Sequence, residues 1–353
     1  MRPENNQSIR SHRKDEHLSL AEIFYQETKN VDEFKQLSLI RPTLPETRVD
    51  QVNLTSSLFN RSLDVPLYIN AMSGGSKRSF KINQQLAQLA YEFNIGIASG
   101  SASILVKEPE QAESFAILRK ENPTGLVMAN INPFVPVSDA KHIVHTMQAD
   151  ALQIHVNVVQ EIIMPEGDRD FVWLDNLKKL QAELDVPVII KEVGFGFDKH
   201  TLDLLEAEGF ETVDLSGSGG TNFAKIENFR RPEHDYNYLD SIGLSTLQSL
   251  LNAQDINMTY LASGGVKTPL DALKCLSLGA QAVGISGVLL HQLERHGYDQ
   301  AKNWLATFIK QLKELTAVFG AQTVTDLPKI QKYYHLELQN YREQLSTDFK
   351  TEH

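Results

Sequence analysis

Short apolar runs recur along the chain, and each is followed by a longer stretch with apolar residues at helical spacing. The stretch that holds Ile82, Leu86, Leu89 and Phe93 illustrates the pattern of an amphipathic helix. Alternation of strand and helix predicts a parallel sheet, and eight such units over roughly 250 residues match a (β/α)8 TIM barrel. The predicted strands are 65–71, 95–99, 126–130, 151–156, 187–193, 212–215, 258–263 and 282–286.

A doubly wound open sheet is the alternative arrangement of the same units. Such a sheet usually carries a GxGxxG turn after its first strand, where this chain reads Met72-Ser73-Gly74-Gly75-Ser76. We therefore expect one domain over residues 1–353, with the barrel core at about 65–290.

Two further segments flank the predicted barrel. An N-terminal extension, with a helix at 20–30 and an extended stretch at 49–54, is placed to cap the barrel bottom. Residues 288–348 are expected to form a C-terminal helical tail.

Composition narrows the functional classes. The polar N-terminus lacks the apolar segment of a secretory signal, and no apolar run approaches the ~20 residues that span a bilayer. Cys275 is the only cysteine, which excludes an intramolecular disulfide and favours a reducing, cytoplasmic location. The net charge of -11 argues against nucleic-acid binding. An anionic substrate would need a local cluster of positive charge.

Polar residues follow nearly every predicted strand, and in a parallel barrel the chemistry lies at the carboxyl ends of the strands. After the fourth strand, Glu161 is suited to Mg2+ and Gln160 to hydrogen bonding with a substrate. The alternatives are a salt bridge from Glu161 to Arg169 and a structural hydrogen bond for His155. The loop that follows carries Glu166, Asp168 and Asp170, and we interpret it as a solvent-exposed loop.

Lys191 stands on the otherwise apolar fifth strand. Burial of a lysine costs several kcal/mol unless the charge is paired. A surface pair with Glu192 is the alternative, but neighbours on a strand point to opposite faces. We favour a functional lysine, either as a Schiff-base residue or as a donor to an electron-rich cofactor.

Glycine-rich stretches stand at the ends of the last three predicted strands, at 216–220, 264–267 and 284–287. Their backbone N–H groups are suited to cradle an anion. Two of these loops lead from strands seven and eight into helix N-termini, which is the phosphate site typical of this barrel. A phosphorylated ligand is therefore expected, and FMN suits a site with small residues for a flat ring and a lysine from strand five.

The one basic cluster of this acidic chain lies near the N-terminus and comprises Arg10, His12, Arg13, Lys14 and His17. It is either a solvated, disordered arm or a clamp for a diphosphate, because Arg and Lys bind phosphate oxygens with charge-assisted bonds. A mobile arm could also close over the site and exclude water.

Together these motifs resemble the type 2 isopentenyl-diphosphate isomerases, in order from about residue 8 to residue 290. The motifs that carry the resemblance are Arg13-Lys14-Asp15-Glu16-His17, Met72-Ser73-Gly74-Gly75, His155-Val156-Asn157 with Gln160-Glu161, Pro165-Glu166-Gly167-Asp168-Arg169-Asp170-Phe171, Lys191-Glu192-Val193-Gly194-Phe195-Gly196, Ser216-Gly217-Ser218-Gly219-Gly220-Thr221-Asn222-Phe223 and Ala262-Ser263-Gly264-Gly265-Val266-Lys267-Thr268-Pro269-Leu270-Asp271-Ala272.

The resemblance implies an FMN-binding barrel that interconverts isopentenyl diphosphate and dimethylallyl diphosphate. It implies reduced FMN, supplied through NADPH, and Mg2+, with no net redox change. The flavin N5/C4a region is then the acid–base group, and catalytic Gln160 assists it. A homotetramer or homo-octamer, with neither membrane nor nucleic acid as a partner, is also implied.

The resemblance also assigns residues. The substrate is held by Arg13, Lys14 and Gln160, and Mg2+ by Glu161. The FMN contacts are Ala71, Met72, Ser73, Ser101, Asn130, Lys191, Ser216 and Thr221, with Gly265, Val266, Lys267, Ser286 and Gly287 around the phosphate.

Two stretches depart from the family pattern. Gly100-Ser101-Ala102-Ser103 stands where the family often has Gly-Ser-Gln-Arg, which puts a basic diphosphate contact in doubt. Ile242-Gly243-Leu244-Ser245-Thr246 stands where Trp-Gly-Ile-Pro-Thr is common, and only local packing is affected.

Two other functions are alternatives. An FMN-dependent 2-hydroxy-acid oxidase would bring a histidine and paired arginines to the flavin, but the strand-seven loop Gly264-Gly265-Val266-Lys267 holds no histidine. A flavin-binding assembly or sensor protein is the non-enzymatic alternative.

Overall fold

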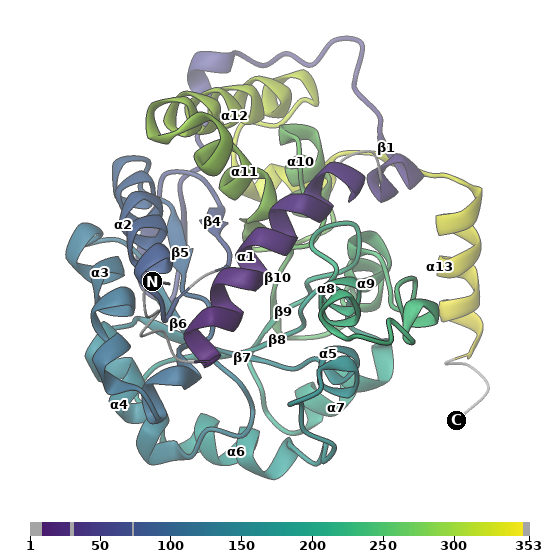
Figure 1. Ribbon diagram of the computed structural model, residues 1–353. Helices are drawn as coiled ribbons and strands as arrows, with labels where there is room; N and C mark the ends of the chain where they lie inside the picture. Colours follow the sequence, from purple (N-terminus) through teal and green to yellow (C-terminus); the bar gives the residue numbers. More distant parts are fainter. Residues whose placement is uncertain (1–8, 29–31, 73, 349–353) are drawn as a thin grey trace.

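A computed structural model describes residues 9–28, 32–72 and 74–348, and its centre is a closed ring of eight parallel strands (Figure 1). The strand order is β10-β9-β8-β7-β6-β5-β4-β11. A parallel bridge between Ala262 and Val283 joins the two outer strands and closes the barrel. All eight predicted strands are confirmed: β4 (Leu67–Ile69), β5 (Gly96–Ala98), β6 (Val127–Ile131), β7 (Ala151–His155), β8 (Val188–Lys191), β9 (Thr212–Asp214), β10 (Thr259–Leu261) and β11 (Val283–Ile285).

Helices surround the barrel because each connection between parallel strands must return across the outside of the sheet. Residues on most barrel strands are buried throughout, since one face meets the helices and the other fills the interior. The helices on the connections are α2 (Lys77–Glu92), α3 (Glu113–Glu121), α4 (Val137–Met147), α5 (Val158–Ile163), α6 (Leu174–Glu183), α7 (Lys199–Ala207), α8 (Phe223–Arg230), α9 (Thr246–Asn252), α10 (Pro269–Ser277) and α11 (Gly287–His296).

A hairpin closes the amino-terminal end of the barrel. It consists of β2 (Ser56–Leu58) and β3 (Arg61–Leu63), and its Leu58 and Leu63 are buried against Leu126 and other residues near the strand starts. The prediction that a helix at 20–30 and an extended stretch at 49–54 cap this end is wrong. Residues Val49–Gln51 form a 3-10 turn, and the apolar residues that fit the barrel bottom come later in the chain.

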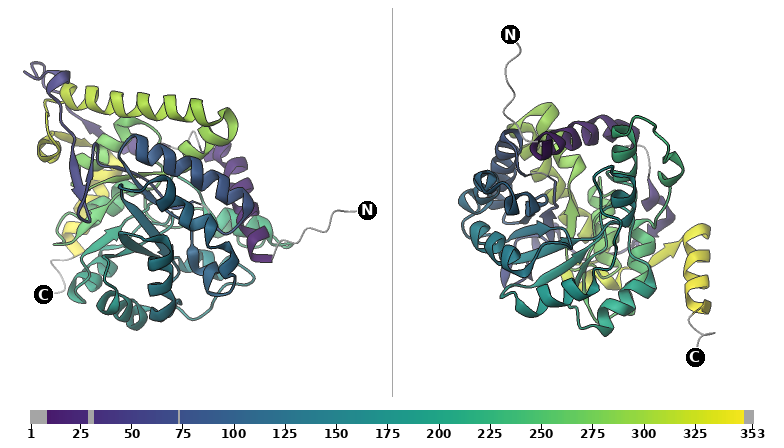
Figure 2. Two further views of the ribbon diagram at one scale, coloured as in Figure 1. Left: turned by 90° about the vertical axis from the view of Figure 1, so that its left-hand side faces the viewer. Right: turned by 60° about the horizontal axis from the view of Figure 1, so that its bottom comes forward.

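The N-terminal helix α1 (Ile9–Thr28) lies across the opposite end of the barrel, as Figures 1 and 2 show. It begins well before the predicted start at 20, so the basic cluster is helical. Leu18, Leu20 and Phe24 are buried. Local pattern did not reveal the first half of α1 because that half is largely polar, and its position depends on contacts with distant elements.

The C-terminal tail is not purely helical. After α12 (Tyr298–Val318), the strand β12 (Lys332–Tyr334) pairs antiparallel with β1 (Leu37–Leu39) before α13 (Leu336–Asp348). The prediction of a helical tail missed β12 because its partner lies near the other end of the chain. The helix α13 packs beside α9 on the outside of the barrel, and Figure 1 labels both helices. Among the described residues, no helix combines the length and apolarity needed to cross a membrane.

Candidate functional site

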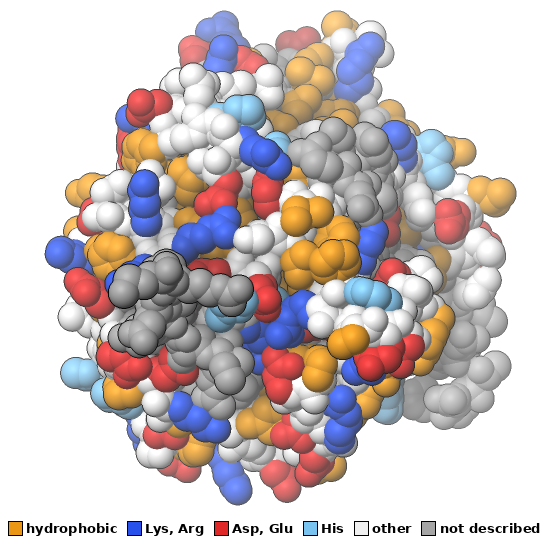
Figure 3. Space-filling view, viewed as in Figure 1, with side chains coloured by type: hydrophobic (Ala, Val, Ile, Leu, Met, Phe, Trp, Pro, Cys, Tyr) orange, Lys and Arg blue, Asp and Glu red, His pale blue; other side chains and the backbone are white. Residues whose placement is uncertain are grey.

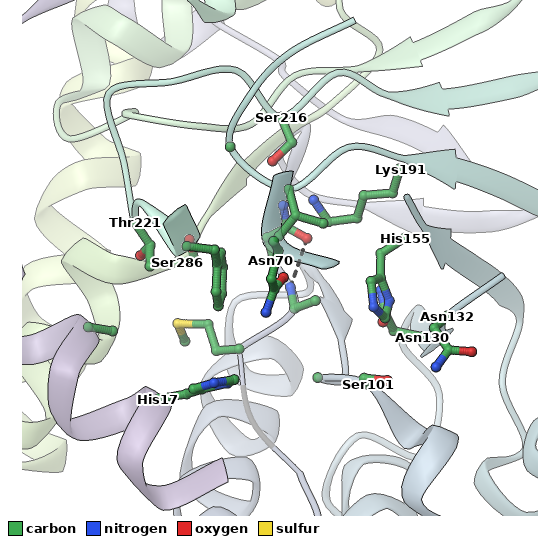
Figure 4. Close-up of a pocket in the computed structure, with 18 of the residues that line it drawn as sticks. His17, Asn70, Ser101, Asn130, Asn132, His155, Lys191, Ser216, Thr221 and Ser286 are labelled. Carbon is green, nitrogen blue, oxygen red and sulfur yellow. Dashed lines mark hydrogen bonds between the residues drawn. The ribbon is translucent and has the colours of Figure 1, made fainter. Parts of the chain in front are cut away.

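A pocket of about 1340 Å³ opens at the carboxyl ends of the strands, below α1. Ser73 lies outside the described residues. Every other predicted site residue lines this pocket: Arg13, Lys14, Ala71, Met72, Ser101, Asn130, Gln160, Glu161, Lys191, Ser216, Thr221, Gly265, Val266, Lys267, Ser286 and Gly287. In Figure 4, Lys191, His155 and Asn70 point into the cavity from the strands, and His17 approaches from α1.

The floor of the pocket holds a buried lysine. Lys191 Nζ donates to the carbonyl oxygen of Glu192 at 2.8 Å and lies 3.4 Å from Asp214 Oδ2. The carboxylate of Glu192 instead accepts from the backbone N–H of Phe195 at 2.5 Å. The surface pair between the Lys191 and Glu192 side chains is therefore not formed, and Asp214 is the counter-ion.

Beside this lysine, His155 is held as a hydrogen-bonded structural histidine. Its Nδ1 lies 2.8 Å from Asn130 Oδ1. Burial, followed by the positive charges of Lys14 and Lys191, lowers the pKa of His155 to about 3. The imidazole is therefore neutral at physiological pH and is poorly suited to accept a proton.

The glycine loops after β9 and β10 pack backbone against backbone. A Cβ on Gly264 would lie 2.0 Å from the carbonyl oxygen of Gly217, and the φ of +97° at Gly264 also favours glycine. Close by, α11 begins at Gly287 with no side-chain cap from Ser286. The free N–H groups of such a helix start are suited to bind a phosphate.

Basic side chains of α1 and α8 meet an acidic side chain of the loop after α5 at the rim, near the middle of the face in Figure 3. Lys14 Nζ donates to the carbonyl oxygen of Ser101 at 3.0 Å, and burial together with the charge of Arg13 lowers the pKa of Lys14 to about 7. Glu166 bridges Arg13 at 3.0 Å and Arg230 at 3.1 Å. We call Arg13, Glu166 and Arg230 the rim cluster.

The acidic loop is only partly as predicted. Asp168 and Asp170 are exposed, whereas Glu166 is exposed but ion-paired. The predicted alternative for Glu161, a salt bridge to Arg169, is not formed. Arg169 instead donates to backbone carbonyls, while Glu161 Oε2 accepts from the backbone N–H of Asp168 at 2.7 Å. Burial raises the pKa of Glu161.

The sequence did not reveal Glu227, a buried carboxylate on α8 that joins α1 to the pocket. It accepts from Gln160 Nε2 at 3.0 Å and Arg230 at 2.5 Å, and it lies 2.9 Å from His17 Nε2. Burial alone would raise the pKa of Glu227, but His17, Arg230 and Gln160 lower it to about 2. No local signal distinguishes it from a surface glutamate.

Within the described residues, no three His, Cys, Asp or Glu side chains gather as a metal site. A cation held by Glu161 would therefore need further ligands from a substrate or from water. This requirement suits Mg2+, which usually binds one or two carboxylates and completes its shell with phosphate oxygens and water.

Comparison with known proteins gives consistent results. The family model described as FMN-dependent dehydrogenase matches residues 107–332. An isopentenyl-diphosphate delta-isomerase of Lacticaseibacillus paracasei is 44% identical over 338 residues, covering 96% of this chain and 97% of the relative. Another, of Staphylococcus saprophyticus, is 42% identical over 344 residues, with 97% and 99% covered.

Solved structures of other flavoproteins share the architecture. A mandelate oxidase superposes with a TM-score of 0.62 at 15% identity, covering 91% of each chain. Flavocytochrome b2 gives a TM-score of 0.66 at 15% identity, with 90% of this chain and 83% of the other covered. At this level of identity, the similarity concerns the barrel fold alone.

Proposed function

The chain belongs to the isopentenyl-diphosphate delta-isomerases, and from this premise we propose that it interconverts isopentenyl and dimethylallyl diphosphate with FMN as cofactor. The observation that carries the proposal is the composition of a single pocket. A buried lysine and glycine loops lie on one side, and Arg13, Lys14, Gln160 and Glu161 lie on the other.

The described residues suit FMN. Ala71 and the glycine loops leave room for a flat ring, and Lys191 would supply a positive charge to it. Gly265, Lys267 and Gly287 line the same pocket and would surround its phosphate near the uncapped start of α11. Contacts from Met72, Ser101, Asn130, Ser216, Thr221, Val266 and Ser286 would complete the site.

The other side of the pocket suits a diphosphate. Arg13 and Lys14 would bind its oxygens, and Glu161 would hold Mg2+ together with them. Lys14 is half neutral near pH 7, so an arriving anion favours its protonated form. Gln160 donates to Glu227 and would position the substrate.

The isomerisation adds a proton to one carbon and removes a proton from another, and reduced FMN would supply the acid and base. The side chains provide binding and exclusion of water. His155 is neutral and Glu227 is ionised among several partners, so neither suits protonation of an alkene. Residues of α1 line the pocket, so this helix would limit the entry of water.

The proposal extends to NADPH as the reductant, a cytoplasmic location and a homotetramer or homo-octamer. Each of these rests on family membership. Light scattering on the purified protein tests the assembly, and replacing NADPH with dithionite tests whether only the reduced state of FMN matters.

The decisive experiment is an anaerobic isomerisation assay on the FMN-loaded protein with isopentenyl diphosphate, Mg2+ and NADPH. Dimethylallyl diphosphate should form only when the flavin is reduced. Oxidation of lactate or glycolate in air, without isomerisation, would assign the protein to the hydroxy-acid oxidases. A flavoprotein with neither activity and no diphosphate affinity would be a sensor or assembly protein.

The role of Glu161 has its own test. Glu161→Gln removes the charge that Mg2+ needs, so we expect a loss of activity of about tenfold or more and a higher Mg2+ requirement. Asp168→Asn, on the exposed loop nearby, is the matched control. An unchanged Mg2+ titration for Glu161→Gln would remove this residue from the metal site.

A further inference from the structure

A buried ion pair lies directly below the floor of the pocket. Lys191 lines the pocket, whereas Asp214 lies behind it and is fully buried. The parallel register of β8 and β9 sets the two residues side by side, and the register of β7 and β8 places His155 next to Lys191. Strand pairing alone therefore brings the carboxylate to the lysine.

The carboxylate of Asp214 is held from several strands. Oδ2 accepts from the Tyr68 hydroxyl at 2.7 Å and from Asn70 Nδ2 at 3.3 Å, and Oδ1 accepts from the Ser263 hydroxyl at 2.7 Å. Burial and the charge of Asp214 raise the pKa of Tyr68, so the phenol remains a donor. The position of the negative charge is thus determined by the barrel.

Lys191 depends on this carboxylate more than Asp214 depends on Lys191. Within the part of the chain that the structure describes, Lys191 Nζ has one other acceptor, the Glu192 carbonyl oxygen. The Glu192 carboxylate accepts backbone N–H groups instead, and burial raises the pKa of Glu192 to about 8, so this side chain offers Lys191 little negative charge at pH 7. A buried ammonium without its counter-ion loses either its proton or its position.

We propose that Asp214 is a positioning residue that keeps Lys191 charged and directed at the flavin. This inference rests on the proposed function, because it assigns FMN to the pocket. It goes beyond that function by giving a role to a residue that has no contact with the pocket. Asp214 acts through Lys191, and the sign of its effect on the flavin follows from that.

The sign separates two possibilities. Were Asp214 to act directly on the flavin, removing its negative charge would stabilise the reduced, more negative flavin and make the midpoint potential less negative. If Asp214 acts through Lys191, removal of the Asp214 carboxylate eliminates the positive charge next to the ring. The reduced flavin is then less stable and the potential becomes more negative.

The test is a potentiometric titration of bound FMN in the holoenzyme, its Asp214→Asn and Lys191→Met variants, and the double variant. Both single variants should shift the potential to more negative values. Loss of one charge-assisted bond should lower the preference of the protein for reduced over oxidised FMN by about tenfold. The double variant should shift no further than Lys191→Met alone.

Ser263→Ala is the matched control, because it removes one donor to Asp214 and leaves the ion pair intact, so its potential should stay near wild type. Should Asp214→Asn not fold, Asp214→Glu keeps the charge but displaces it, and a smaller shift in the same direction is expected. A less negative potential, an unchanged potential or additive shifts would overturn the proposal.

The outcomes also separate this inference from the proposed function. If the wild-type protein binds FMN but does not isomerise the diphosphate, only the proposed function is overturned. The midpoint potentials of the variants then still test the role of Asp214. A wild-type protein that binds no FMN overturns both.

Discussion

The floor pair, Lys191 with Asp214, and the rim cluster, Arg13 with Glu166 and Arg230, use the same ionic chemistry in different surroundings. At the floor both side chains are almost inaccessible, with 4% and 0% of their areas exposed. At the rim, Arg13 and Glu166 are 25% and 42% exposed. Water therefore screens the rim pairs strongly and hardly affects the floor pair.

The difference indicates different roles. A buried pair stays in place because losing either partner leaves an uncompensated charge in a medium of low polarity. A partly exposed pair costs little to open, so under the proposed function Arg13 would leave Glu166 for the stronger acceptors of a diphosphate. The floor is suited to hold a cofactor in a constant field, and the rim is suited to exchange partners during turnover.

Breaking the floor pair should have the largest effect. Asp214→Ala leaves the Lys191 ammonium buried, and we expect the free energy of unfolding to fall by about 4 kcal/mol. Lys191→Met should cost less, about 1–2 kcal/mol, because Asp214 keeps its bonds from Tyr68, Asn70 and Ser263. Urea unfolding measures both values. Equal losses of unfolding free energy in the two variants would contradict the inference that Lys191 depends on Asp214 more than Asp214 depends on Lys191.

Glu227 combines features of the two regions, since it is buried like the floor pair but bonded to rim residues. Lowering its pKa from 4.5 to about 2 corresponds to about 3 kcal/mol. Because the folded pKa is lowered, this stability is present above pH 4.5 and is lost as the pH falls toward 2. Chemical unfolding from pH 6 to pH 2 should therefore show a steeper acid loss in wild type than in Glu227→Gln. Parallel curves would contradict this account.

At the rim, Lys14 should make substrate binding depend on pH. Its pKa is lowered to about 7, so above that pH the side chain is increasingly neutral and holds the diphosphate less well. We expect the KM for isopentenyl diphosphate to rise by up to about tenfold per pH unit above 7. Lys14→Arg keeps its charge and should flatten the rise. Ionisation of the substrate affects wild type and Lys14→Arg equally. An identical dependence of KM on pH in the two proteins would therefore exclude Lys14 as the titrating group.

Opening the rim cluster should have the smallest effect on stability. Glu166→Gln weakens the contacts to Arg13 and Arg230, and the unfolding free energy should change by less than about 1 kcal/mol. Glu183→Gln, in the exposed pair with Lys141, is the control and should behave alike. A loss at Glu166 comparable to that of Asp214→Ala would remove the distinction between rim and floor.

The local sequence pattern was sufficient to predict the barrel and the residues that lie at the ends of its strands. The alternation of apolar runs and helical stretches is read over a few residues at a time, and a parallel barrel places the end of every strand at one face. Lys191 could also be recognised from local pattern as a functional candidate, because it is a charged residue on an apolar strand. Asp214 carries the same signal on 212–215, but its pairing with Lys191 follows from strand register.

The sequence by itself therefore determined the barrel, the glycine-rich loops at its strand ends and the family to which the chain belongs. Only the tertiary structure decided what covers each end of the barrel, which carboxylate balances Lys191, and that Glu227 joins α1 to Gln160. These features depend on contacts between segments far apart in the chain. Hydrophobic periodicity records which face of an element is buried, but not which partner meets a polar group there.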